Sequence, residues 1–222
     1  VVGNQDVELS GGGLLFSSNA RSMPRLSLGI DDYLVIPFTR KMIAVKGAFS
    51  NAWMTDNNYI SGGMIQHKFI GLRLGGGKIP VSLNYEFHHA AQWGGVSPEF
   101  GDLGHGFHDF LNTFLSRPGS GVEMDKINAQ GNHLGSQQLG ADYQSDKLAI
   151  STYWQNIFED SPIKAPWRAM NLPDGLFGVA VNLKHFKPIR KIVYEHLETT
   201  DQSGPLHDMD GLVFGGADNY FN

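Results

Sequence analysis

Residues 79–93, IPVSLNYEFHHAAQW, alternate between two kinds of side chain. One set is mainly apolar or aromatic and consists of Ile79, Val81, Leu83, Tyr85, Phe87, His89, Ala91 and Trp93. The other set is mainly polar and includes Ser82, Asn84, Glu86, His88 and Gln92. Successive side chains of a β-strand point to opposite faces of the sheet, so this period of two predicts a strand with one apolar and one polar face. The run is longer than the mean strand of about five or six residues.

Similar alternation recurs along the chain and predicts about eight strands in all. The clearest further examples are 42–53, 147–158 and 176–184. Less regular candidates are 24–38, 64–74, 138–144 and 189–199. Glycine supplies 28 of the 222 residues, and each glycine inside a helix costs about 1 kcal/mol relative to alanine. The sequence therefore predicts an all-β fold with little helix.

The links between the expected strands alternate between short and long. Short links cover 75–78, 144–147 and 185–188, whereas long links cover 55–63, 94–135, 159–175 and the chain after 199. If consecutive strands are antiparallel neighbours, all short links lie at one end of the sheet. Short turns at one end and long loops at the other are typical of an outer-membrane β-barrel. Aromatic residues are expected near the long-loop ends as an interfacial girdle, namely Trp53, Trp93, Trp154 and Phe158.

Composition excludes several classes of protein. Lys and Arg total 17 against 22 for Asp and Glu, a net charge of −5. The sequence therefore lacks the excess of basic residues that nucleic-acid binding needs. The chain has no cysteine, which excludes disulfides, thiolate metal sites and a cysteine nucleophile. It contains no run of about 18 apolar residues that would predict a transmembrane helix.

Several stretches resemble the capsule assembly family called Wzi. They are FLNTFLSRPGSGVEMDKINAQGNHLGS (110–136), WQNIFEDSPIKAPWRAMNLPDGLFGVAVNLK (154–184), VYEHLETTDQSGPLHD (193–208) and the terminal GADNYFN. Gly131-Asn132-His133-Leu134-Gly135 and Thr200-Asp201-Gln202-Ser203-Gly204 are the signatures that carry the resemblance. It covers nearly the whole chain and is stronger after residue 85.

This resemblance implies an outer-membrane β-barrel that binds capsular polysaccharide and assists capsule assembly or attachment at the surface of a Gram-negative bacterium. The family's barrel is larger, with eighteen strands, and open sheet edges are not tolerated in hydrocarbon. Residues 1–222 are therefore expected to be a single barrel domain, incomplete at one or both ends, in contact with outer-membrane lipid. Two alternatives remain open, a diffusion channel and a soluble all-β protein that binds or hydrolyses glycans.

Sugar recognition combines aromatic rings with a few placed polar side chains. The expected long-loop end supplies eight such candidates for carbohydrate binding: Trp93, Asp109, Asn112, Asn132, His133, Trp167, Arg168 and Asp174. Residues 107–115 also predict a short amphipathic helix in the longest loop. That helix is expected either to cover the barrel mouth or to form a wall of a glycan site.

The sequence predicts no enzyme, metal or cofactor. Glycoside hydrolysis needs two carboxylates facing each other across a cleft, and the available ones, Glu86, Asp109, Glu159 and Asp160, are not placed so by the sequence. Adjacent His88 and His89 point to opposite faces of a strand and cannot share a metal. Residues 75–78 (GGGK) are followed by Ile79, whereas a phosphate-binding loop needs Ser or Thr there, so they predict a hairpin turn.

Overall fold

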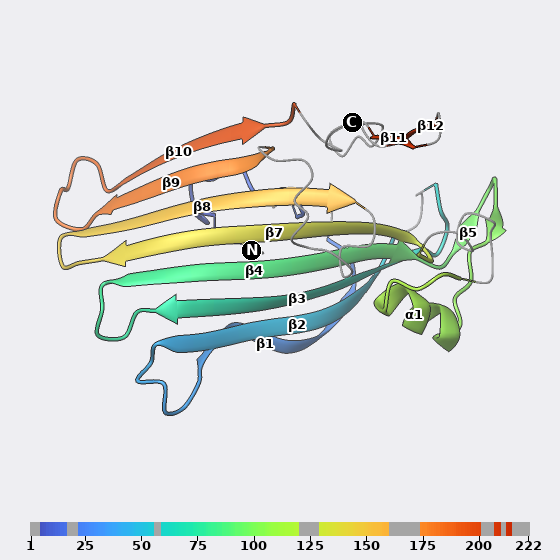
Figure 1. Ribbon diagram of the computed structural model, residues 1–222, viewed down its shortest axis with the longest axis horizontal. Coiled ribbons are helices and arrows are strands. Elements are labelled where there is room, and N and C mark those ends of the chain that lie inside the picture. The colour runs from blue at the N-terminus through green and yellow to red at the C-terminus, as the bar shows by residue number, and fades with distance from the viewer. Residues whose placement is uncertain are drawn as a thin grey trace.

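The computed structural model is dominated by one long antiparallel sheet with a short helix at one end (Figure 1). The structure describes residues 5–16, 22–55, 59–119, 129–159, 174–200, 207–209 and 212–214. Eight strands follow one another across the sheet in chain order: β1 (Arg25–Val35), β2 (Ile43–Trp53), β3 (Met64–Gly75), β4 (Val81–Trp93), β7 (Asn132–Gln144), β8 (Leu148–Glu159), β9 (Gly175–Leu183) and β10 (Lys191–Glu198). The all-β prediction is confirmed, and this sheet is open, with β1 and β10 at its edges.

The remaining described elements are small. Helix α1 (Phe107–Phe114) lies within one residue of the predicted helix. Two separate hairpins pair β5 (Val96–Ser97) with β6 (Gly101–Asp102), and β11 (His207–Met209) with β12 (Leu212–Phe214). Among the described residues, no helix has both the length and the apolar character needed to cross a membrane.

The predicted strands are confirmed with one large shift. Strand β7 begins at Asn132 rather than at residue 138, so Asn132 and His133 belong to a strand and not to the long loop. The ladder with β4 extends to the pair Gln92 and Asn132. Residues 131–138 (GNHLGSQQ) contain none of the β-branched or aromatic side chains that mark strands. Pairing with a long neighbour, rather than local propensity, makes this segment extended.

The links sort by length as predicted. Short turns at 36–42, 76–80, 145–147 and 184–190 share the left end of the sheet in Figure 1, and the strand ends that the longer links join share the right end. The predicted glycine hairpin is also present, because Gly75, Gly76 and Gly77 all have positive φ. The amide of Gly76 donates to the carbonyl of Val81 at 2.7 Å and closes the turn.

The strand register gives the sheet two unlike faces. On the apolar face, Leu72, Tyr85, Leu139, Trp154 and Phe177 lie opposite one another across five neighbouring strands. On the polar face, one position along, Glu86, Gln138 and Gln155 lie opposite one another in the same way. The alternation seen in residues 79–93 is therefore continued by the strands on either side.

Burial on these faces is the reverse of that in an ordinary globular core. The largest fully buried side chains in the described part of the chain are His88, Gln138, Gln155, Glu86 and Asn156. Large apolar side chains are instead exposed on the apolar face: Leu74, Leu83, Leu139, Phe177, Val179 and Tyr194. Isolated exposed apolar residues are ordinary, but a contiguous apolar surface marks an interaction site.

The expected aromatic girdle is only partly present. Trp53 and Trp93 end their strands, lie on the apolar face and both flank Met64 in the register. Trp154 lies in the middle of β8, opposite Leu139 and Phe177, so its predicted position near a loop was wrong. Trp93 is buried, with its ring against Phe110 of α1. The helix, which the alternation could not place, covers this ring.

Candidate functional site

A buried polar chain occupies the centre of the polar face. One carboxylate oxygen of Glu86 lies 2.8 Å from Lys46 Nζ, and its other oxygen lies 3.2 Å from His88 Nε2. His88 Nδ1 is in turn 3.2 Å from His67 Nε2. The residues come from β2, β3 and β4, so the chain joins three strands. Buried charges are stable in a protein when they are paired and hydrogen-bonded in this way.

A β-bulge in the edge strand completes this chain. Between Ile30, which pairs with Gly47, and Leu34, which pairs with Val45, residues 31–33 oppose Lys46 alone. The bulge directs Tyr33 to the polar face, where its hydroxyl donates to Glu86 Oε1 at 3.4 Å. Its ring lies 4.7 Å from Lys46 Nζ, within range of a cation–π contact. Bulges recur where a side chain must be redirected at a site.

A small pocket opens beside this chain on β1–β4, and we call it the edge pocket. Its volume is about 200 Å³. It is lined by the Lys46–Glu86–His88 chain and by seven further residues: Arg25, Ser27, Asp31, Ala48, Ser50, His67 and Phe69. Hydroxyl, carboxylate, guanidinium and aromatic groups thus face one space.

The aromatic side of the edge pocket is built from three nearly parallel rings. His67 and His88 are stacked with centroids 5.4 Å apart and an interplanar angle of 1°. Phe69 stacks on His88 at 5.1 Å and 18°. Phe16 packs edge-on against His67 at 4.7 Å. Since these rings are held from several directions, the wall has a fixed orientation.

Residues 5–14 lie against the other half of the polar face. Gln155 Nε2 donates to Gln5 Oε1 at 2.6 Å, and the amide of Leu14 donates to Gln155 Oε1 at 3.1 Å. Ser10 Oγ donates to Glu195 Oε1, also at 2.6 Å. The N-terminal segment therefore covers β8 and β10, and its last described residue, Phe16, reaches His67 of β3 beside the edge pocket.

An ion pair fixes the start of this segment. Lys191 Nζ lies 2.8 Å from Asp6 Oδ2. Burial alone would raise the pKa of Asp6, but hydrogen bonds from Lys191 and from the amides of Leu9 and Glu8 outweigh it and lower that pKa. The contact is therefore present at neutral pH, and it weakens as acid protonates this carboxylate.

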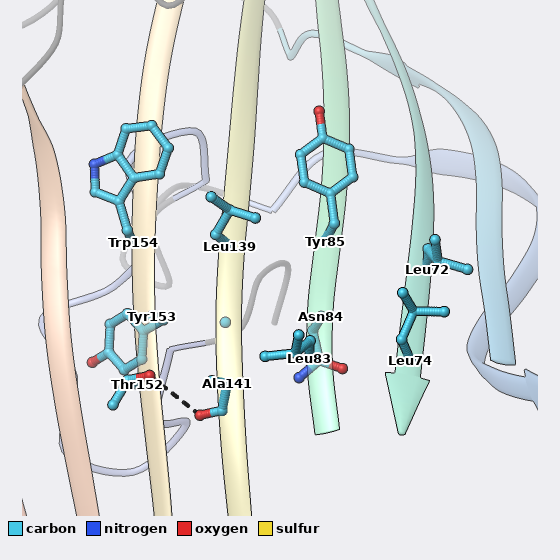
Figure 2. Close-up of a pocket in the computed structure, with 11 residues that line it drawn as sticks. Leu72, Leu74, Leu83, Asn84, Tyr85, Leu139, Ala141, Thr152, Tyr153 and Trp154 are labelled. Atoms are coloured by element: carbon cyan, nitrogen blue, oxygen red, sulfur yellow. Dashed lines mark hydrogen bonds between the residues drawn. The ribbon is translucent and has the colours of Figure 1, made fainter. Parts of the chain in front are cut away.

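The apolar face carries a larger but shallow depression of about 540 Å³ (Figure 2). Leu72, Leu83, Tyr85, Leu139 and Trp154 surround it, and the small side chain of Ala141 leaves space among them. Asn84 and Tyr153 also border it, but their side chains point to the other face of the sheet (Figure 2). Most of the side chains around it are apolar, and Tyr85 and Thr152 add hydroxyl groups.

Two predicted sugar ligands are buried beneath α1. Trp93 Nε1 donates to Asn51 Oδ1 at 3.0 Å. His133 Nε2 donates to the carbonyl of Gln130 at 2.8 Å, and its Nδ1 lies 2.8 Å from His89 Nε2. Because a carbonyl oxygen only accepts, neutral His133 carries its proton on Nε2 and accepts from His89. The bond to Gln130 ties the end of the long loop to β7.

Asp109 and Asn112 make similar internal contacts within the long loop. Asp109 accepts hydrogen bonds from the amide of Gly106 and from Gln130 Nε2, both at 2.9 Å. Asn112 Nδ2 donates to Gln130 Oε1 at 3.3 Å. Asp109 thereby joins the first turn of α1 to the residues that precede β7.

We expect Asp109→Ala to destabilise the protein by about 0.5–2 kcal/mol, the usual cost of losing a helix cap. The change also removes the contact with Gln130, so fraying should extend from α1 to the start of β7. Amide hydrogen exchange of Phe110 and Leu111 measures this loss. Glu99→Gln, in the same loop but outside the helix, is the matched control. Unchanged protection in Asp109→Ala contradicts the prediction.

Asn132 and Asp174, two other predicted sugar ligands, do not belong to the group of residues around α1. Asn132 is exposed at the first position of β7. Asp174 is buried beside β9, where it accepts from the amide of Thr200 at 2.9 Å. Trp167 and Arg168 lie outside the described residues. The structure thus brings together Trp93, Asp109, Asn112 and His133, in internal contacts at the α1 junction.

Carboxylate and histidine candidates separate onto different faces. Glu86 belongs to the polar face, whereas Asp109 is on α1 against the apolar face, so these two do not face each other across a cleft. His88 contacts Glu86 and His89 contacts His133, which confirms that the adjacent histidines point in opposite directions. Among the described residues, no three His, Asp or Glu side chains are grouped to hold a metal ion.

The edge pocket was not predicted from the sequence. Its residues lie on strands, whereas the predicted sugar ligands were expected at the long-loop end. The available signal was the set of polar and charged residues at alternate strand positions, including Lys46, His67 and Glu86. Comparison with known proteins adds no assignment, because no family model, curated protein or solved structure matches this chain.

Proposed function

We propose that this chain forms part of an outer-membrane β-barrel that binds capsular polysaccharide and assists its attachment to the cell surface. The observation that carries the proposal is the inverted burial of the sheet, with Glu86 and His88 fully buried while Leu83 and Leu139 are exposed. A bilayer is the solvent in which such a sheet is stable, because its apolar face then contacts hydrocarbon.

The topology supports the same proposal. Long tilted strands, short turns at one end and long loops at the other belong to barrels of the outer membrane. The edges β1 and β10 have unpaired backbone groups in the described part of the sheet, and hydrocarbon does not satisfy such groups. We therefore propose that the eight strands are one sector of a larger closed barrel, with its long loops outside the cell.

Polysaccharide binding is supported by sequence resemblance and by the chemistry of the polar face. The Wzi-like stretches include residues 131–135, which end the longest loop and begin β7. The polar face presents aromatic rings next to hydroxyl and charged groups, as sugar sites do. A diffusion channel is less well supported, since residues 5–16 cover part of this face.

Deleting the gene in its native host tests the proposal. We expect the polysaccharide to be made in normal amount but shed into the medium, because its surface attachment is lost. Capsule bound to cells and capsule in the supernatant are quantified separately, with the gene restored on a plasmid as the control. If the capsule stays attached and uptake of small solutes falls, the protein is a channel and the attachment function is wrong.

A further inference from the structure

We propose that the edge pocket binds a single hexuronate residue of an acidic polysaccharide, with Arg25 holding the sugar carboxylate. This inference rests on the proposed polysaccharide function and names the sugar class and the site. Its support comes from groups that the fold leaves available, from the size and walls of the pocket, and from its place along the barrel axis.

The polar groups of the pocket form two sets, which differ in whether they are already paired within the protein. Lys46 and Glu86 are already paired with each other at 2.8 Å, and Glu86 is further bound by His88. Arg25, Asp31 and Ser27 also line the pocket, but no hydrogen bond or ion pair engages their side chains within the described ranges. The first set therefore stabilises the fold, and the second set is free to bind a ligand.

The free groups match the chemistry of a hexuronate. A guanidinium such as that of Arg25 binds a carboxylate through two parallel hydrogen bonds. The carboxylate of Asp31 accepts only, so it suits neighbouring sugar hydroxyls, and the hydroxyl groups of Ser27 and Ser50 both donate and accept. Only an acidic ring offers Arg25 a carboxylate, so a hexuronate can pair with the guanidinium where a neutral sugar cannot.

Size and shape also favour one ring. The pocket's volume of about 200 Å³ is smaller than the roughly 300 Å³ at which sites for drug-sized ligands begin. Phe69 and His67 form a fixed aromatic wall against which the C–H face of a pyranose can pack. A polysaccharide is therefore expected to place one residue in the pocket while the rest of the chain continues along the sheet.

The position of the pocket gives it access to the long-loop end. Arg25 begins β1 and pairs with Ala52, next to the last residue of β2, and Ser50 pairs with His67 close by. Glu86 lies deeper, toward the middle of β4. The free guanidinium is thus at the end that we place outside the cell, where surface polysaccharide arrives.

Titration calorimetry of the full chain in detergent micelles tests the site. The probes are methyl glucuronide and methyl glucoside, which differ in the carboxylate. We expect the glucuronide to bind at least tenfold more tightly, and Arg25→Gln to remove that difference. Arg190→Gln, in the β9–β10 turn, is the matched control and should behave as the wild type. Equal binding of both glycosides by the wild type overturns the proposal.

A second arm separates this inference from the proposed function. The host's purified capsular polysaccharide is titrated into the wild type and into Arg25→Gln. Weaker binding by the variant supports both the function and the site. Equal binding by the two proteins leaves the function intact and overturns the site. Absence of binding in the wild type, with an Arg25-dependent response to glucuronide, refutes the capsule function and supports the pocket.

Discussion

If the apolar face contacts lipid as proposed, replacing Leu139 by arginine is expected to destabilise the protein by about 2–4 kcal/mol, the cost of a cation at a lipid-facing position near the bilayer midplane. Leu139 is exposed in the middle of β7 on the apolar face. Its register neighbours there are Tyr85 and Trp154. Urea unfolding of the protein from lipid vesicles, followed by tryptophan fluorescence, measures the free energy difference from the wild type.

Phe186→Arg is the control for this prediction. Phe186 is equally exposed, but it lies in the turn between β9 and β10, away from the strands. If the apolar face contacts lipid, only Leu139→Arg weakens the protein strongly. In a sheet surrounded by water, both changes are ordinary surface substitutions within about 0.5 kcal/mol of the wild type. Equal small effects would therefore place this face in water and refute the barrel.

The sequence predicted the strands well because alternation follows directly from strand geometry. In residues 79–93 each polar position lies on one face and nearly every apolar position on the other, and β4 forms with the expected faces. Helix α1 was predictable from the spacing of Phe107, Phe110 and Phe114. The start of β7 was not predictable, because its glycine and amide side chains are extended only through pairing with β4.

The candidate site could not be assembled from the sequence. Lys46, His67 and Glu86 come from three strands, and their contacts depend on the register between those strands. The bulge at 31–33, which turns Tyr33 onto the polar face, contains neither glycine nor proline, the strongest sequence signals of an irregular strand. Position within a loop was a poor guide, since Asp109 and Asn112 use their polar atoms to hold Gln130.

Replacing Glu86 by glutamine is expected to cost about 3–5 kcal/mol, the usual loss when one partner of a buried ion pair is removed. The amide keeps the size of the side chain but removes the charge opposite Lys46, which is mostly buried. The amide keeps only one acceptor oxygen, whereas the carboxylate uses both, one toward Tyr33 and the other toward His88. The free energy of unfolding from detergent micelles measures the change, with Asp146→Asn in the exposed β7–β8 turn as the control.

A double-mutant cycle shows whether this loss comes from the ion pair itself. Lys46→Met removes the other charge, and we expect the double variant to be more stable than Glu86→Gln, because no uncompensated cation stays buried. Additive losses in the double variant would mean that Lys46 reaches water and does not depend on Glu86. In that case the polar chain joins β4 to β1 through Tyr33 and to β3 through the contact between His88 and His67, and the edge pocket lies beside a wetter surface.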